Sequence, residues 1–119
     1  MTADPSRTVG DLVWRVGKAR GALLMHLDGV PIAQAPPEAS ADLDSLAGEY
    51  AGLLRQAQAL AAELDLGAAR SFSVRAANHP VVFAFVPGDL ALGVETRPSG
   101  LRGQMRHALA QALGQLGEK

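Results

Sequence analysis

The sequence predicts an α+β fold: a five-stranded antiparallel sheet sandwiched between one long helix and two helices, in the order α-β-β-α-β-β-β-α. First, Asp28-Gly29 separates two apolar runs at about residues 21–34, which is the strongest short-range signal for a β-hairpin with a type I′ turn. Second, one long helical pattern covers about residues 42–66. Third, short strands joined by tight turns follow it. This arrangement buries every apolar face that the pattern creates.

The first helix is predicted to follow a polar, flexible tail over residues 1–6. Its apolar residues recur at spacings of three and four, and Ser6 or Thr8 is placed to cap its start. After the hairpin turn, Pro31 has no N–H to give to a neighbouring strand, so we expect the second strand at an edge of the sheet. The prolines at 36 and 37 then predict a linker that is neither helix nor strand there.

The long helix carries one apolar stripe with a period near 3.6, which we interpret as core. The stripe consists of Leu43, Leu46, Tyr50, Leu53 or Leu54, Ala57, Leu60 or Ala61, and Leu64. Gly67 is placed to end the helix. Gly48 and Gly52 lie on another side, together with Ala59. Because glycine inside a helix costs about 1 kcal/mol relative to alanine, either another helix approaches closely here or the helix tolerates these residues on a solvent face.

The C-terminal half predicts three strands and a helix. Residues 70–76 alternate between apolar and polar, which is typical of a strand with one solvated face, and such a strand can stand at a sheet edge. Residues 81–86 are apolar throughout, as in a central strand. Tight turns place them in an antiparallel meander with residues 90–96. The last helix is expected to begin near Ser99.

Length and composition favour a single domain over residues 7–119, since 119 residues with 48% hydrophobic content can bury a core. The net charge of −1 argues against nucleic acid or an anionic membrane as the main partner. There is no cysteine, no signal-peptide pattern and no apolar run approaching the roughly 20 residues needed to span a bilayer. We therefore expect a cytoplasmic protein without disulfides.

The chain shows no motif for catalysis or cofactor binding. His26, His79 and His107 lack the i, i+4 spacing of a helical metal site. No serine lies in a G-x-S-x-G motif, and no glycine-rich loop has a nucleotide-binding pattern. The sequence therefore predicts no catalytic residue, no metal site and no cofactor. A small-ligand sensor or enzyme with a pocket between sheet and helix is the least favoured function.

Several segments, taken in order, resemble the Roadblock/dynein light chain family over about residues 7–116. They are the glycine–strand–Asp-Gly–strand opening at 20–33, the small-residue-rich central helix at 44–57, the last strand at 88–94 and the helix entry at 100–102. The resemblance implies the fold predicted above. It also implies a homodimer in which the long helix and the third strand pair with their counterparts.

The resemblance further implies a regulatory function. Bacterial and archaeal relatives lie beside small Ras-like GTPases, and the MglB-type members act as GTPase-activating proteins, whereas other members are scaffolds. We expect a non-catalytic homodimer that binds such a GTPase and stimulates its hydrolysis, or a protein-assembly module with a different partner. The expected dimer or partner interface comprises Gly48, Tyr50, Gly52, Arg55, Ala59, Arg70, Phe72 and Val74.

Overall fold

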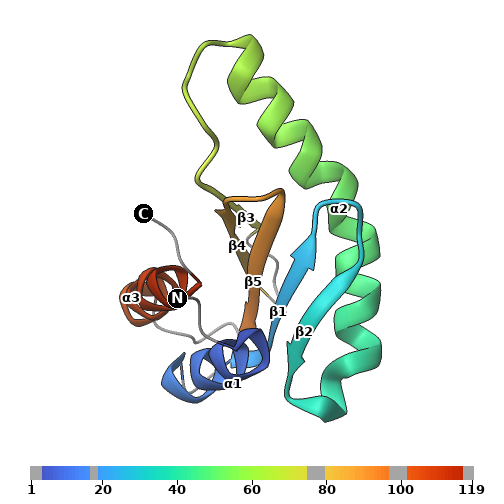
Figure 1. Cartoon of the computed structure of the whole chain (residues 1–119), viewed down its shortest axis with the longest axis vertical. Coiled ribbons are helices and arrows are strands. Elements are labelled where there is room, and N and C mark those ends of the chain that lie inside the picture. Colours follow the sequence, from blue (N-terminus) through green and yellow to red (C-terminus); the bar gives the residue numbers. More distant parts are fainter. Residues whose placement is uncertain (1–3, 17–18, 75–79, 97–101, 117–119) are drawn as a thin grey trace.

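The computed structural model describes residues 4–16, 19–74, 80–96 and 102–116 (Figure 1). Its helices are α1 (Pro5–Val16), α2 (Ser40–Glu63) and α3 (Arg102–Gln115), with a short 3-10 turn, η1, at Pro37–Ala39. Its strands are β1 (Ala19–His26), β2 (Pro31–Ala35), β3 (Ser71–Val74), β4 (Val81–Val86) and β5 (Leu90–Thr96). They form one antiparallel sheet in the order β2-β1-β5-β4-β3. The predicted fold class, the meander and the edge position of β2 are confirmed.

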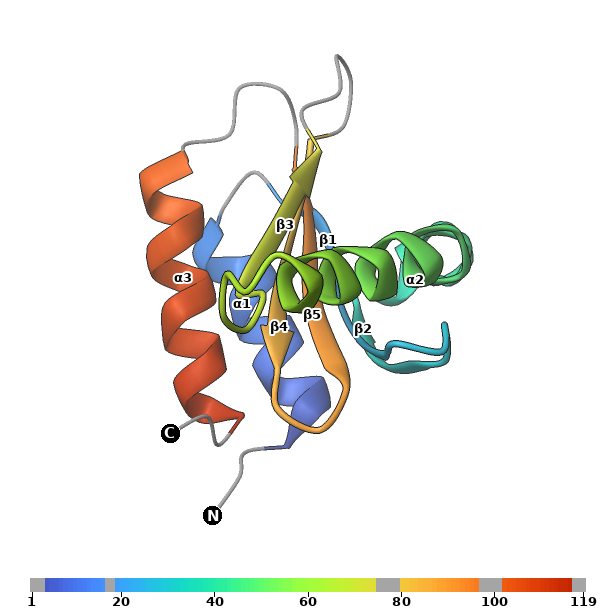
Figure 2. The ribbon, with the colours of Figure 1, turned by 90° about the horizontal axis from the view of Figure 1, so that it is seen from above.

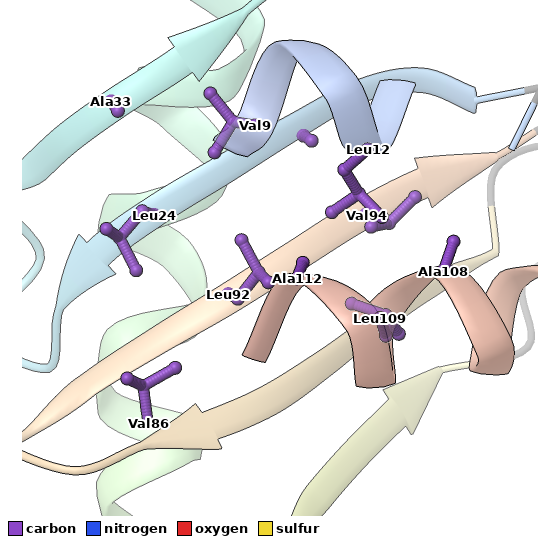
Figure 3. Close-up of a cluster of buried hydrophobic side chains, with 11 residues drawn as sticks. Val9, Leu12, Leu24, Ala33, Val86, Leu92, Val94, Ala108, Leu109 and Ala112 are labelled. Carbon is purple, nitrogen blue, oxygen red and sulfur yellow. The ribbon is translucent and has the colours of Figure 1, made fainter. Parts of the chain in front are cut away.

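The sheet separates two hydrophobic cores. Figure 2 shows α1 and α3 on one face of the sheet and α2 on the other. Because successive strand residues point to opposite faces, Leu24 of β1 packs in the α1/α3 core whereas Leu23 packs under α2. The α1/α3 core, drawn in Figure 3, comprises Val9, Leu12, Ala22, Leu24, Ala33, Val86, Leu92, Val94, Ala108, Leu109 and Ala112. The α2 core is built around Leu43, Leu54 and Phe83.

Helix α1 begins at Pro5, inside the predicted tail. Proline suits the first helical position because the N–H that it lacks would find no partner within the helix. The Asp4 carboxylate accepts a hydrogen bond from the Ser6 N–H at 3.1 Å, and the Asp4 carbonyl accepts one from the Thr8 N–H at 3.0 Å. Asp4 therefore caps the helix, and the expectation that Ser6 or Thr8 caps it was wrong.

The β1–β2 hairpin is confirmed, but its predicted turn type is wrong. The closing pair is His26 and Val30, with the His26 N–H donating to the Val30 carbonyl at 2.9 Å. Gly29 has φ +99°, whereas Asp28 has no positive φ as a type I′ turn would need. The three-residue loop leaves Leu27 buried, only 4% exposed, in the α2 core. Burial of this leucine explains why the longer loop replaces the tight turn.

Both ends of α2 also differ from the prediction. The linker after β2 contains η1, and α2 starts directly after it at Ser40. The helix stops at Glu63, before Gly67, because Asp65 adopts the left-handed conformation with φ 56°. Asp65 and Leu66 donate their N–H groups to the carbonyls of Ala62 and Ala61 at 3.2 and 2.9 Å, which satisfies the last turn in a Schellman motif. The Ser99 cap expected for the last helix lies outside the described residues.

We expect Gly48→Ala to stabilise the folded protein by about 0.5–1 kcal/mol, because alanine is the better helix former. A Cβ at Gly48 has nothing within 4 Å in this chain. Urea unfolding monitored by circular dichroism measures the change. A loss of stability would instead show that a second chain approaches this side of α2 closely, which was one of the two explanations for its glycines.

Candidate interaction surface

Helix α2 covers the sheet with only part of its length. Its buried residues are Leu43, Ala47, Ala51 and Leu54, and no residue of α2 after Leu54 is buried. Figure 1 shows the C-terminal part of α2 extending beyond the sheet. The expectation that one continuous stripe of α2 forms core is therefore wrong for its second half, because that half has no sheet beneath it.

A second row of apolar residues runs along α2 beside the buried one. We call it the α2 seam, and it consists of Leu46, Tyr50, Leu53, Ala57, Leu60 and Leu64. Its spacing alternates between four and three residues, which is the heptad pattern of helices that pack side by side. Leu53, Leu60 and Leu64 are 45%, 54% and 58% exposed. The seam is thus an apolar helix face that lacks a helical partner among the described residues.

Tyr50 joins the α2 seam to strand β3. Its ring centroid lies 6.4 Å from that of Phe72 in an edge-to-face arrangement and 5.2 Å from that of Phe83. Phe72 and Val74 are partly buried, and both come from the same face of β3 because they are two residues apart. The α2 seam, Phe72 and Val74 therefore form one connected area, which we call the α2/β3 surface.

The outer edge of β3 pairs with no other described strand. The Phe85 N–H donates to the Arg70 carbonyl at 3.0 Å, and β3 pairs with β4 in the register Phe72↔Phe83 and Val74↔Val81. Residues of an antiparallel strand alternate in the side to which they bond, so Ser71 and Ser73 direct their N–H and C=O groups away from β4. Both serines are exposed. Such an edge is a template for another strand.

The structure brings together only part of the interface predicted from the sequence. Tyr50, Phe72 and Val74 belong to the α2/β3 surface, and exposed Arg70 directly precedes β3. Gly48, Gly52 and Ala59 lie more than about 100° around α2 from the seam, as the pitch of 3.6 residues per turn requires. The Arg55 guanidinium donates a hydrogen bond to the Leu27 carbonyl and so ties α2 to the β1–β2 hairpin.

Sequence reasoning missed Leu53, Leu60 and Leu64 as surface residues. A period near 3.6 identifies an apolar helix face but does not tell how much of that face the same chain covers. The available signal was the strict four–three spacing from Leu46 to Leu64, which favours a helical partner over a sheet.

The α2/β3 surface offers apolar contact area and backbone hydrogen bonds. Over the described residues, no three His, Cys, Asp or Glu side chains gather as metal ligands would. His26 and His107 are exposed, while His79 lies outside the described residues. None of the described helices combines the length and the apolar character that crossing a bilayer requires.

A sheet covered by two helices on one face and one long helix on the other defines a small α+β domain. The Roadblock/LC7 domain matches residues 7–94, and the chain belongs to this family. No curated protein matches the sequence.

Solved structures share this fold at low sequence identity. MglB from Myxococcus xanthus is 20% identical with a TM-score of 0.84, over 93% of this chain and 89% of that chain. A Roadblock/LC7 domain from Streptomyces avermitilis is 18% identical with a TM-score of 0.81, over 94% and 93%. An MglB with a tetrameric arrangement is 20% identical with a TM-score of 0.79, over 98% and 90%.

Proposed function

We propose that the chain is a non-catalytic homodimer, assembled through the α2/β3 surface, that regulates a small Ras-like GTPase. The observation that carries the dimer is the connection between the α2 seam, in which Leu53, Leu60 and Leu64 are exposed, and the edge strand β3. An apolar helix face or an edge strand alone is common, but a second copy of the chain can cover both at once. The tetrameric arrangement of an MglB relative supports self-association in this family.

One twofold axis satisfies both parts of the surface. Two copies of β3 paired antiparallel around Phe72 let Ser71 of each chain exchange hydrogen bonds with Ser73 of the other. Because Tyr50 contacts Phe72, the same axis passes close to the middle of the α2 seam and sets the two seams side by side. An interface of this kind is isologous, with the same patch used by both chains, and it closes after two copies.

The GTPase partner rests on the family, and among the described residues no cluster of metal-ligating side chains points to chemistry of the chain's own. The guanidinium groups of Arg15 and Arg55 are held within the chain by Gln111 and the Leu27 carbonyl. We propose that stimulation works by repositioning the GTPase's own residues; the arginine that could be inserted instead is exposed Arg70, which directly precedes β3. Cytoplasmic localisation belongs to the same proposal, because small Ras-like GTPases act in the cytoplasm.

Single-turnover GTP hydrolysis by the Ras-like GTPase encoded nearest to this gene tests the proposal. We expect a complex and a faster rate when the chain is in excess, and we expect Arg70→Ala to change that rate by less than about threefold. A supplied arginine is worth about 10³–10⁵ in rate, so a loss of that size in Arg70→Ala would contradict repositioning. Failure to form any complex would contradict the GTPase partner, while a complex without acceleration would favour a scaffold.

A further inference from the structure

Strand β2 is the second edge of the sheet, and within the described part of the chain no strand pairs with its outer side. The Leu27 N–H donates to the Asp89 carbonyl at 2.9 Å, on the β5 side of β1, and the His26 N–H donates to the Val30 carbonyl just before β2. Alternation therefore assigns Leu24 and Ala22 to the β2 side of β1. Their partners in β2 are Ala33 and Ala35. Gln34, between these two alanines, therefore directs its N–H and C=O away from the sheet.

A groove runs along this edge. It has a volume of about 570 Å³ and is lined by Ser6 at the start of α1, by Pro31–Gln34 of β2, by Pro37 of η1 and by Asp44 of α2. Val30 and Ile32 are both exposed, which provides an apolar contact beside the open backbone. The groove thus has the three elements of a strand-addition site, namely unpaired backbone groups, apolar contacts and flanking walls.

The one charged side chain among the described lining residues is acidic. Asp44 is exposed and accepts a hydrogen bond from the Gln34 side-chain amide, which fixes the carboxylate beside the strand edge. A carboxylate has about four acceptor sites, so most of its capacity is available to a cation. Glu38 and Asp42, also exposed, lie on either side of the start of α2. The described lining residues include no lysine or arginine.

We propose that the β2 edge binds an extended basic segment of a partner protein, which adds to the sheet as a further strand beside Gln34. An apolar side chain of the segment packs on Ile32, and a lysine or arginine pairs with Asp44. A second copy of this chain fits the edge less well, because twofold pairing of β2 would bring two acidic stretches from Glu38 to Asp44 together. The acidic rim equally disfavours nucleic acid.

The probe for this site is a blocked hexapeptide of alternating valine and lysine, titrated to millimolar concentration into the ¹⁵N-labelled full chain. We expect saturable shifts of the Ile32 and Gln34 amide signals and slower hydrogen exchange of the Gln34 N–H. The matched valine–glutamate peptide should bind more weakly by about fivefold, in keeping with the modest strength of exposed ion pairs. Unchanged Ile32 and Gln34 signals, or equal affinity for the acidic peptide, would overturn the proposal.

Two pairs of variants separate backbone pairing from charge. Gln34→Pro removes the outward N–H, whereas Gln34→Ala keeps it. We therefore expect the proline variant to bind the peptide about tenfold more weakly than the alanine variant. Asp44→Lys should weaken binding by about fivefold, while Glu49→Lys, elsewhere on α2, should leave it within twofold. If Asp44→Lys binds the basic peptide as well as the parent, or if β2 pairs with a second copy instead, the assignment of a basic partner is wrong.

Discussion

Replacing Leu53 with glutamate is expected to convert the proposed dimer into monomers, weakening self-association at least about 100-fold. Leu53 is 45% exposed in the single chain, so the fold does not need it. In the proposed dimer it lies at the middle of the α2 seam, where a carboxylate would be buried without a partner. Light scattering over a range of protein concentrations measures the shift from twice the 12.3 kDa chain mass to the chain mass itself.

Ala59→Glu is the matched control for this result. It places the same charge on the same helix, but on the side that carries Gly48 and Gly52, and we expect it to remain a dimer. The reverse outcome, with Ala59→Glu monomeric and Leu53→Glu dimeric, would move the interface to the glycine side of α2. A monomeric parent protein would contradict the dimer altogether.

Gly93→Ala is expected to lower the free energy of unfolding by at least about 2 kcal/mol through overpacking of the core. A Cβ at Gly93 would lie 2.5 Å from Cε1 and 2.8 Å from Cδ1 of Phe83, distances at which neighbouring atoms must move. Phe83 is fully buried and pairs with Gly93 across β4 and β5, so its ring has little room to move. Urea unfolding followed by far-UV circular dichroism measures the loss.

A second substitution shows whether the Phe83 ring is the cause. In a Gly93→Ala background, Phe83→Leu removes the atoms that clash, so the two changes together should cost less than the sum of each alone. If the two losses in unfolding free energy simply add, the new methyl group clashes with the backbone and not with the Phe83 ring. A cost below about 0.5 kcal/mol for Gly93→Ala, the range of ordinary surface substitutions, would contradict the packing described here.

The order of elements could be predicted from the sequence because each depends on local chemistry. Periodicity located the long helix, and Pro31 placed β2 at an edge. Element ends were less predictable where a side chain competed with the expected signal. Buried Leu27 changed the hairpin turn, Asp4 replaced the expected caps, and Asp65 ended α2 before Gly67.

The interaction surface was only partly predictable, for a different physical reason. Tyr50, Phe72 and Val74 could be proposed from the family resemblance, and the structure places them on one surface. Which seam residues stay exposed depends on where the sheet ends beneath α2. The residue pattern of the helix alone does not contain that information. The contact between Phe83 and Gly93 likewise depends on the register of β4 against β5, which is fixed by the assembled sheet.

We propose that the chain associates through the β3 edge together with the α2 seam. Amide hydrogen exchange at Ser71, Ser73 and Gln34, measured on the associated protein without any added partner, tests it most directly. All three N–H groups point away from the sheet in a single chain, but only the two serines lie in the proposed interface. We expect slow exchange at Ser71 and Ser73 and fast exchange at Gln34, whereas fast exchange at both serines in an associated sample would rule out this interface.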